Sequence, residues 1–583
     1  MFRIAKKLFS IFNKAQKVRI GVIFVLMIIG AGFETLGVSM IVPLMTTLME
    51  PDFFSKNRYA VLVSEALDIH SSKTFVMALL LAMMAVFIIK NIFLYLEYYV
   101  QQRFVCNNRT WLQRRIMKAI LDRPYEYFLS TNTGDIQRTI ITDVESVFYM
   151  LNNFMMVATE SVVSLVLVIA IFVINPVMAT LVVAIILVEM LLIGFVLKPV
   201  MRKNGDRQRE VNAGLNKWII QAVSGIKETK VDQKENFFLS NYEKYAKNNA
   251  KLQCQVNVLT NAPRLIIEAV TISAMLLFIT ILLYNGQDVK TLMPQLSAFA
   301  VAAVRLLPSA NRISSAANAI PLGEASLDAV IKVMKEMKEW ESAERDVSVN
   351  VGSSERLSLN DCASLRGITF SYSNSDKCIL KNADMSIPVG KSIGIIGPSG
   401  AGKTTTVDIL LGLLHPQEGK VLSDGVDIMT DYEDWLSKIS YIPQNIYMID
   451  DTIAANVAFG VNKEDIDKDR VMKALHDAQL SEMIEELPDG IDTEIGERGM
   501  RLSGGQRQRI GIARALYTNP SILVFDEATS ALDNETEAAI MESINALHGT
   551  KTMVIIAHRL TTVRDCDIIY KVADGKIAET TLS

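Results

Sequence analysis

Long apolar runs dominate the first half of the chain and are missing from the second half. Ile20 to Met49 forms one apolar run that a single charge, Glu34, interrupts. Further runs follow at about 74–100, 147–175, 177–197, 256–284 and 291–320. Because about 20 apolar residues in a helix cross a bilayer, each run is long enough to span a membrane. The pattern predicts six spanning helices, the third and fourth separated only by the turn signal Asn175-Pro176.

Basic residues gather in three segments that flank these runs. They lie before the first span, after the second and after the fourth, and include Arg3, Lys17, Arg103, Arg115, Lys198 and Arg207. Cytoplasmic loops carry such an excess of lysine and arginine, so we expect all three segments inside the cell. The sequence therefore predicts a multi-pass protein of the cytoplasmic (inner) membrane, with a cytoplasmic N-terminus. The run at 20–49 is too long for a signal-peptide core, and we expect it to be retained.

The polar segments between the spans have helical periodicity. Residues 101–145 and 198–255 read as span helices that continue past the bilayer and are joined by turns near 122–125 and 224–226. Residues 1–19 form an N-terminal interfacial segment, whose amphipathic part at 2–15 reads either as a helix in the inner interface or as a frayed terminus. Residues 53–69 read as a second amphipathic helix, on the outside.

Composition changes once the spans end. We divide the chain into a transmembrane domain at 20–322, a linker at 323–359 and an α/β domain at 360–583, where short β-rich runs alternate with helical stretches. The fold class is an all-α six-helix membrane domain followed by an α/β phosphate-loop domain. The net charge of −4 argues against a nucleic-acid partner. The five cysteines contain no CxxC pair, which fits neither a disulfide scaffold nor a zinc site.

A glycine-rich loop in the second domain carries the strongest chemical signal. The apolar strand 393–396 runs into Gly397-Pro398-Ser399-Gly400-Ala401-Gly402-Lys403-Thr404-Thr405 and then into an apolar helix. This strand, loop and helix order is that of the phosphate-binding loop of nucleotide hydrolases. Its backbone N–H groups close on phosphate, and the helix N-terminus favours the negative charge. Lys403 is expected to reach the β- and γ-phosphates, and Thr404 to give its hydroxyl to Mg²⁺.

A second apolar strand, 522–525, ends in two acids. Asp526 is placed to hold Mg²⁺, and Glu527 to orient and deprotonate the attacking water. Together with the phosphate loop, this pair predicts nucleotide hydrolysis and not binding alone.

The segment Leu502-Ser503-Gly504-Gly505-Gln506 is more specific still. At this point the chain resembles the ATP-binding cassette (ABC) transporters, whose signature sequence this is. The resemblance covers the whole chain and implies a half-transporter of the exporter type, the type IV fold. It implies further roles: Tyr372 stacks on adenine, Gln444 contacts Mg²⁺ and senses the γ-phosphate, Asp533 belongs to the D-loop, and His558 is the switch histidine.

The resemblance also implies a dimer. In this family the signature of one subunit, here Ser503 to Gln506, completes the ATP site of the other. All site elements are intact in this chain, so two identical active sites in a homodimer are the simpler interpretation, while a heterodimer stays open. The helical turns near 122–130 and 220–228 resemble the coupling helices that transmit the motion of the ATPase to the spans.

Charges inside the apolar runs are the main indication of the cargo. Lys90, Arg264, Arg305 and Arg312 lie in expected spans, where a charge is costly and marks function by default. Arginine binds phosphate through two parallel hydrogen bonds, so an anionic cargo head is one interpretation. The alternative is that these cations only pair with Glu34, Glu97, Glu160, Glu189 and Glu268, or extend to the membrane surface.

A closer resemblance involves these same positions. The stretch Arg305 to Ile313, the pair Pro263-Arg264, Lys90 and the segment 53–69 are similar to the lipid-linked oligosaccharide flippases of bacterial protein N-glycosylation. The implied cargo is a polyprenyl-pyrophosphate glycan, with the arginines near the pyrophosphate and segment 53–69 beside the polyprenyl tail. Lysine stands at position 90 where arginine is expected. A multidrug, lipid or peptide exporter of the same fold is the alternative.

Overall fold

The computed structural model divides the chain into two compact units. It describes residues 2–39, 72–174, 176–284, 306–350, 356–372, 375, 377–527, 542, 544, 547–557 and 559–581. The first unit contains residues 1–123 and 130–343, and the second contains residues 124–129 and 344–583. The expected outer helix at 53–69 lies outside the described residues.

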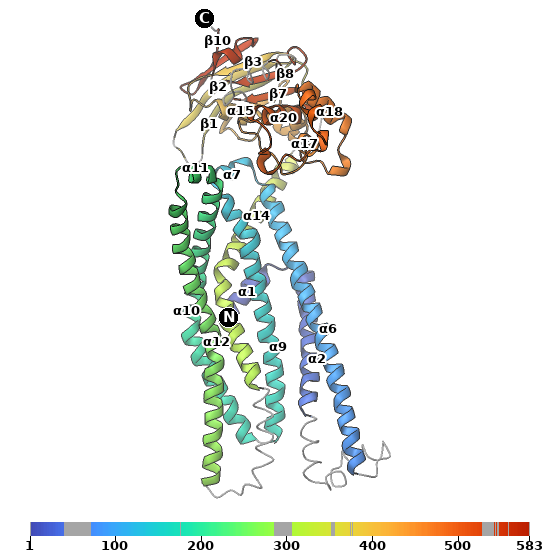
Figure 1. Ribbon diagram of the computed structural model, residues 1–583, viewed down its shortest axis with the longest axis vertical. Coiled ribbons are helices and arrows are strands. Elements are labelled where there is room, and N and C mark those ends of the chain that lie inside the picture. The colour runs from blue at the N-terminus through green and yellow to red at the C-terminus, as the bar shows by residue number, and fades with distance from the viewer. Residues whose placement is uncertain are drawn as a thin grey trace. The chain divides into compact units, whose positions relative to one another are not determined.

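The first unit consists of helices (Figure 1). They are α1 (Phe2–Ser10), α2 (Lys14–Ser39), α6 (Ser72–Leu121), α8 (Thr133–Arg138), the π-helix η1 (Thr139–Asp143), α9 (Val144–Ile174), α10 (Pro176–Ser224), α11 (Ile226–Val231), α12 (Glu235–Tyr284), a helical stretch at 306–319, the 3₁₀ turn η2 (Ile320–Gly323) and α14 (Glu324–Asn350). α10 packs along α12, and α2 contacts both α6 and α9. α9 ends at Ile174 and α10 begins at Pro176, which agrees with the turn signal in the sequence.

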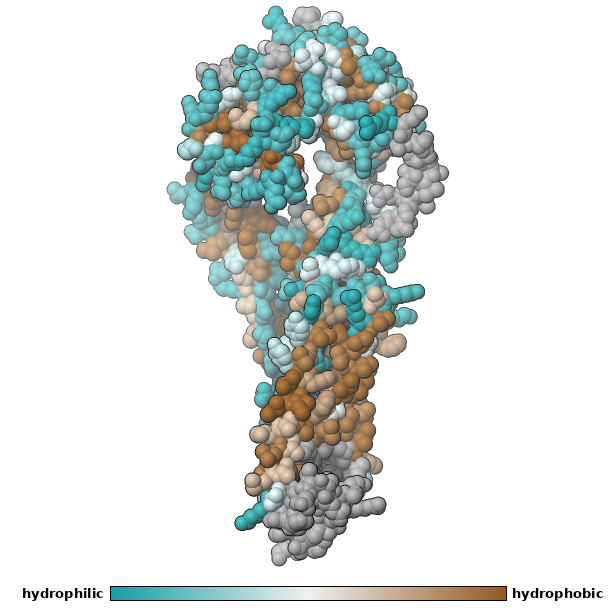
Figure 2. Space-filling view, turned by 90° about the vertical axis from the view of Figure 1, so that its right-hand side faces the viewer, coloured by the Kyte–Doolittle hydropathy of each residue, from teal (hydrophilic) through white to brown (hydrophobic). Residues whose placement is uncertain are grey.

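Three helices of the described chain meet the length and hydropathy needed to cross a membrane. They lie at Lys14–Glu34, Lys73–Leu121 and Thr133–Ile169. Much of the expected spans at 177–197 and 291–320 lies where side chains or backbone are not described. Large apolar side chains of α6, such as Leu81, Ile89 and Ile92, are exposed. In Figure 2 the surface of these helices is brown over a broad band, as expected of helices that face lipid.

The N-terminal segment is a helix and not a frayed end. Ile4 and Leu8 of α1 are buried, together with Phe12 just beyond it, in a cluster with side chains of α6 and α9. Lys7 pairs with Asp328 of α14 at 2.5 Å. One face of α1 therefore packs on the helix bundle, while Phe2 is 88% exposed.

Short helices, and not single turns, join the long helices at their polar ends. α6 ends at Leu121 and is followed by α7 (Tyr125–Ser130), and α10 ends at Ser224 before α11. Both lie where the sequence shows turn signals and resembles coupling helices. Most of α7 groups with the second unit, where Glu126 accepts a hydrogen bond from the backbone N–H of His415 at 3.1 Å.

The second unit contains two sheets. The antiparallel sheet has the order β2-β1-β4-β5, formed by β1 (Cys362–Ser371), β2 (Cys378–Pro388), β4 (Glu418–Ser423) and β5 (Val426–Asp427). The other sheet has the order β10-β9-β3-β8-β7-β6, formed by β3 (Ser392–Ile396), β6 (Ile439–Ile442), β7 (Ile522–Asp526), β8 (Thr552–Ile556), β9 (Ile568–Ala573) and β10 (Lys576–Thr580). Its strands are parallel except β10, so their carboxyl ends share one edge.

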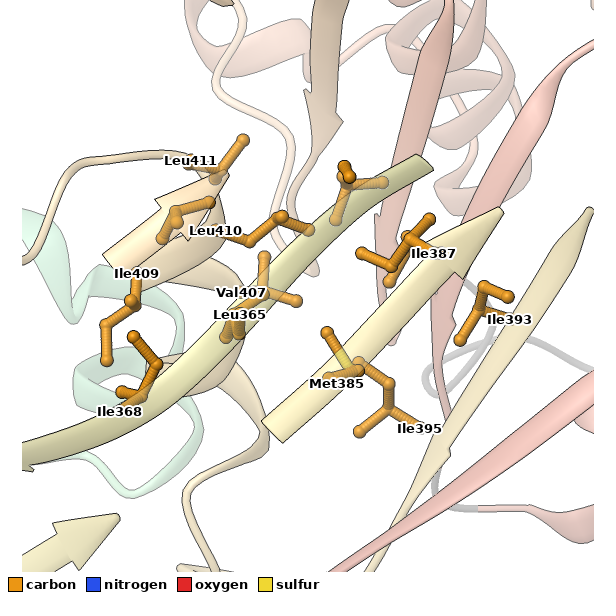
Figure 3. Close-up of a cluster of buried hydrophobic side chains, with 14 of the residues drawn as sticks. Leu365, Ile368, Met385, Ile387, Ile393, Ile395, Val407, Ile409, Leu410 and Leu411 are labelled. Carbon is orange, nitrogen blue, oxygen red and sulfur yellow. The ribbon is translucent and has the colours of Figure 1, made fainter. Parts of the chain in front are cut away.

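Helices cover both faces of the six-stranded sheet. They include α15 (Lys403–Leu410), α16 (Tyr432–Lys438), α17 (Ile453–Val457), α18 (Lys468–Asp477), α19 (Ser481–Glu486) and α20 (Gly504–Tyr517). Ile522 and Val524 of β7 pack with α15, whereas Leu523 and Phe525 pack with α20. Because side chains alternate along a strand, α15 and α20 lie on opposite faces. Figure 3 shows Val407, Ile409 and Leu410 of α15 in one buried cluster with side chains of β1, β2 and β3.

Candidate functional site

The phosphate loop takes the form that its glycines allow. Gly397, Gly400 and Gly402 have φ angles of 155°, 74° and 104°, which L-residues rarely adopt. A Cβ atom on Gly397 would overlap the carbonyl oxygen of Val572. The loop therefore needs glycine both for its backbone angles and for its close approach to β9. The side chain of Lys403, 5% exposed, donates from Nζ to the carbonyls of Gly397 and Pro398 at 3.0 and 3.3 Å.

Tyr372 lies beside this loop. Its hydroxyl and that of Thr405 are 2.9 Å apart, and its ring meets Phe370 edge-on. The sequence places the two hydroxyls 33 positions apart, and the structure brings them together. An aromatic face next to a phosphate loop can stack on a nucleobase.

The carboxylate of Asp526 is buried at the end of β7 and next to the loop. It interacts with the hydroxyl of Thr404 and accepts a hydrogen bond from the Tyr441 hydroxyl at 3.0 Å. Burial raises the pKa of Asp526, which these two hydrogen bonds partly offset. The Asp526 carboxylate and the Thr404 hydroxyl of the phosphate loop are oxygen ligands of the kind that Mg²⁺ prefers. Asp526 and Thr404 therefore fit a magnesium ion bound with ATP.

Tyr441 was not expected from the sequence. It lies on β6, beside β7 in parallel register, and its burial together with Asp526 raises its pKa. The pairing of β6 with β7 places Tyr441 beside β7. Nothing in the sequence indicates that its hydroxyl reaches Asp526.

Glu527 follows Asp526 in an uncommon backbone conformation, with φ of 51°. Strained residues of this kind cluster at functional sites. Its backbone N–H donates to the carbonyl of Ile556, and its Oε2 accepts from Gln444 Nε2 at 2.9 Å. The structure thus brings together Gln444 and Glu527, which the sequence assigns to phosphate sensing and to the base. Asp533 and His558 lie outside the described residues.

The signature segment begins α20. Ser503 caps the helix: its Oγ accepts from the Gln506 N–H at 3.2 Å, and Gln506 Oε1 accepts from the Ser503 N–H at 2.8 Å. Gly504 and Gly505 lie in the first turn of α20. The backbone N–H groups of a first helical turn have no partner within the helix and can bind an anion. Since α20 and α15 lie on opposite faces of the sheet, the signature and the phosphate loop are separate surfaces of one chain.

The first unit contains a large cavity of about 1220 Å³, whose wall is mostly apolar but also carries polar and charged side chains. α2, α6, α9, α12 and the stretch 306–319 line it. Its wall includes the amides Gln101, Gln102, Asn152, Asn153, Asn261 and Asn311, the tyrosines Tyr98 and Tyr149, the carboxylates Glu34, Glu97, Glu160 and Glu268, and the arginines Arg264 and Arg312. A wall that combines these hydrogen-bonding groups with apolar side chains suits a cargo that has both a polar and an apolar part.

The four expected cargo residues differ in their surroundings. Arg312 pairs with Glu160 at 2.5 Å, and Ser309 donates to the same carboxylate at 2.7 Å. Arg264 lines the cavity with an exposed side chain, and within the described chain it makes no hydrogen bond or ion pair. Lys90 lies over the ring of Phe87 at 4.7 Å and is not among the residues that line this cavity. Arg305 lies outside the described residues.

A side chain of a neighbouring helical stretch bonds to the backbone of α12 close to Arg264. Pro263 lies inside α12, where proline removes a backbone donor. The Ser315 hydroxyl donates to the carbonyl of Thr260 at 3.1 Å. Neighbouring side chains can bond to backbone carbonyls near a proline in a membrane helix, and here the contact joins α12 to the stretch 306–319.

Comparisons with known proteins agree with this arrangement. The family profile described as "ABC transporter transmembrane region" matches residues 11–298, and that described as "ABC transporter" matches residues 380–530. A protein of Cupriavidus pinatubonensis called "ATP-dependent lipid A-core flippase" is 29% identical, over 81% of this chain and 79% of that protein. A protein of Francisella novicida with the same name is 40% identical over 39% of this chain and 38% of that protein.

A solved structure is similar over nearly the whole chain. It is that of a bacterial Atm1-family ABC exporter with ATP bound, with a TM-score of 0.71 and 23% identity, over 97% of this chain and 95% of that one. The predicted fold class, a helical membrane domain followed by a nucleotide-binding domain, is confirmed. The chain belongs to the ABC transporters: it is a multi-pass, ATP-hydrolysing half-transporter with the exporter fold.

Proposed function

We propose that this chain flips a polyprenyl-pyrophosphate-linked oligosaccharide across the inner membrane. The observation that carries the proposal is Arg264, an exposed guanidinium on the cavity wall without an ion-pair partner in the described chain. A cation that faces a cavity within the membrane without a counter-ion is costly, so an anionic ligand would stabilise it. Guanidinium binds phosphate oxygens in pairs, which suits a pyrophosphate.

The remaining cations have different places in this proposal. Arg312 forms an ion pair with Glu160. It would bind the cargo only if its guanidinium contacted both groups at once or left Glu160. Arg305 and Lys90 are proposed as cargo residues from the sequence resemblance alone. The polar amides around Arg264 support a cargo whose head extends beyond the phosphates.

For the ATPase we propose roles that follow from the geometry and the family. Tyr372 stacks on adenine, residues Gly397 to Thr405 bind the phosphates, and Lys403 moves from the loop carbonyls to the β- and γ-phosphates. Thr404, Gln444 and Asp526 would hold Mg²⁺, which neutralises phosphate charge. Glu527 accepts a proton from the attacking water, and His558 and Asp533 lie near the γ-phosphate and the dimer contact.

We further propose a homodimer with cytoplasmic nucleotide-binding domains and N-termini. The signature residues Ser503 to Gln506 and the phosphate loop belong to helices on opposite faces of one sheet. A complete site would therefore combine the phosphate loop of one chain with Ser503 of the partner subunit. Hydrolysis removes the γ-phosphate that joins the two domains, and the domains separate.

A second candidate cargo is a phosphorylated glycolipid of the lipid A-core class. The relatives named above favour it, because they are called ATP-dependent lipid A-core flippases. Both candidates are lipids with an anionic head and sugars, and the cavity wall suits both.

ATP hydrolysis in proteoliposomes separates these candidates. We expect a polyprenyl-pyrophosphate glycan to stimulate the full-length protein more than a lipid A-core glycolipid does. Stimulation by the lipid A-core glycolipid alone would favour the second candidate. Stimulation by neither, with clear stimulation by apolar drugs or peptides, would contradict both. Mass spectrometry of copurifying lipids provides an independent check.

A further inference from the structure

A buried carboxylate without a partner lies on the cavity wall. Glu97 of α6 is only 7% exposed and lines the cavity. Within the described chain no side chain or backbone group donates a hydrogen bond to it, and no cation pairs with it. By contrast, the equally buried Glu160 is joined to Arg312 and Ser309. Leaving a buried carboxylate unpaired costs several kcal/mol in general, so a ligand that donates hydrogen bonds would stabilise Glu97.

The neighbouring helix makes room for this carboxylate. A Cβ atom on Gly30 of α2 would overlap Oε2 of Glu97, and it would also come close to Leu94. Only glycine at position 30 therefore leaves Glu97 its present place. The position of the carboxylate depends on both helices, and a larger residue at position 30 would displace it.

Other acceptors on the same wall are also unsatisfied. The side-chain oxygens of Asn152 on α9 and Asn311 in the stretch 306–319 are buried without a donor, and both residues line the cavity. Three helices around this cavity thus carry acceptors that have no donor in the described chain, and the two amide oxygens among them are enclosed by protein atoms. Arg264 on the same wall is a cation that makes no ion pair in the described chain, and it suits an anion. Together they match a ligand that has both an anionic group and several hydrogen-bond donors.

We infer that Glu97, with Asn152 and Asn311, forms a subsite that binds hydroxyl groups of a sugar next to the phosphate of the cargo. One carboxylate accepts hydrogen bonds from two neighbouring hydroxyls, and it does so more strongly than a neutral acceptor. A site that is built to bind hydroxyls rejects an analogue without them, since its buried groups then stay unpaired. Glu97 is therefore a specificity residue for the sugar. The identity of the lipid rests on the proposed function, whereas the sugar subsite does not.

The test measures lipid binding to the full-length protein in detergent by native mass spectrometry. The first pair of probes is a polyprenyl-pyrophosphate oligosaccharide and the same polyprenyl pyrophosphate without sugar. The second pair is a phosphorylated glucosamine-disaccharide lipid and phosphatidic acid. For Glu97→Gln we expect the Kd of the sugar-bearing lipid to rise about tenfold or more, because a charge-assisted hydrogen bond is weakened. The Kd of the sugar-free lipid is expected to stay within about twofold.

Two further variants make the result specific. Gly30→Ala keeps the charge and shifts the end of a flexible carboxylate side chain, so it is expected to change the same Kd as Glu97→Gln but by a smaller factor. Glu243→Gln replaces an exposed carboxylate that pairs with Lys247 outside the cavity, and it is expected to change neither Kd. Unchanged binding of the sugar-free lipid also shows that the cavity of each variant is folded.

The outcomes distinguish the inference from the proposed function. If the first pair does not bind the natural protein but the second pair gives the expected pattern, the proposed cargo is wrong and the sugar subsite stands. If Glu97→Gln raises both Kd values equally, or neither, Glu97 has a structural role and the inference is overturned. Failure of the natural protein to prefer the sugar-bearing lipid in both pairs overturns it as well.

Discussion

Gln444 donates a hydrogen bond from Nε2 to Oε2 of Glu527 at 2.9 Å. The residue that is expected to contact the γ-phosphate thus holds the residue that is expected to activate water. Glu527 is further fixed by its backbone bond to Ile556 and by its positive φ. A base that is positioned before the nucleotide arrives needs little rearrangement when the site closes, which favours fast chemistry.

Glu527→Gln is expected to bind ATP but barely hydrolyse it. Glutamine keeps an oxygen that can accept the hydrogen bond from Gln444, so the local geometry is retained while the basic carboxylate is lost. General-base catalysis contributes about 10²–10⁴-fold, and we expect turnover to fall by about that factor. Steady-state ATPase and nucleotide-binding assays measure both quantities. Near-normal turnover would remove Glu527 from the base role.

Arg312→Ala is expected to destabilise the membrane domain more than Arg264→Ala. Removing Arg312 leaves the buried carboxylate of Glu160 with Ser309 alone, whereas Arg264 has no ion pair to lose in the described chain. Thermal unfolding in detergent compares the two. The double variant Arg312→Ala with Glu160→Gln should recover part of the loss, because no buried charge is then left unpaired. Equal melting temperatures for the two single variants would refute this difference.

For transport we expect the reverse order, with a larger loss of lipid flipping in Arg264→Ala than in Arg312→Ala. Arg264→Ala removes the guanidinium that faces the cavity, and we expect it to lose most of the flipping of a pyrophosphate-linked lipid in reconstituted vesicles. Arg264→Lys keeps the charge but not the paired geometry, and it should recover transport only in part. Normal flipping by Arg264→Ala would return this residue to a structural role.

The sequence predicted what is encoded locally. The phosphate loop, the acidic strand end and the signature are each contiguous, and their glycines and caps dictate backbone geometry without help from distant residues. The break at Pro176 and the ends of α6 and α10 were likewise predicted from nearby turn signals. The turn signals were less informative at 122–133 and 224–235, because they predicted turns where the structure has short helices.

Pairings between distant residues could not be predicted. Arg312 and Glu160 are 152 positions apart, and five carboxylates were equal candidates as partners. The sequence likewise says nothing of Gly30 facing Glu97, because that contact depends on how α2 packs against α6. Charge in an apolar run indicates that a residue matters, but only packing decides whether it is paired or faces a cavity.

The stability of the nucleotide-binding domain should depend on Asp567 in a pH-dependent way. Hydrogen bonds from the Ser392 N–H and hydroxyl, together with Lys391, hold the pKa of the Asp567 carboxyl below its ordinary value. The folded pKa is the lower one, so the stabilisation is present above the unfolded pKa of about 3.9 and is lost as pH falls through the folded value.

Asp567→Asn is therefore expected to lower the free energy of unfolding by about 1 kcal/mol at pH 7. The difference from the natural protein should shrink as pH falls below about 4, where the carboxyl of the natural protein becomes protonated. Denaturant unfolding, followed by the fluorescence of the domain at several pH values, measures this. A difference that does not vary with pH would mean that shape, and not charge, is what Asp567 contributes.

Asp143 joins three helical elements of the membrane domain. Its carboxylate, 1% exposed, accepts hydrogen bonds from Arg209 of α10 at 3.1 Å and from Ser326 of α14 at 2.8 Å. Asp143 itself ends the π-helix η1, a form that often occurs at functional sites. A buried ion pair loses about 3–5 kcal/mol when one partner is removed, because the other charge stays buried.

We expect Asp143→Ala to lower the free energy of unfolding of the membrane domain by about 2–3 kcal/mol, below the buried-pair range because Arg209 is partly exposed. Ser326→Ala should cost about 1 kcal/mol, since it removes one hydrogen bond and leaves the ion pair. If Asp143 also holds α9, α10 and α14 together during transport, Asp143→Ala should reduce the stimulation of ATP hydrolysis by cargo more than Ser326→Ala does. Equal effects of the two variants on both stability and stimulation would show that the ion pair adds nothing beyond the hydrogen bond.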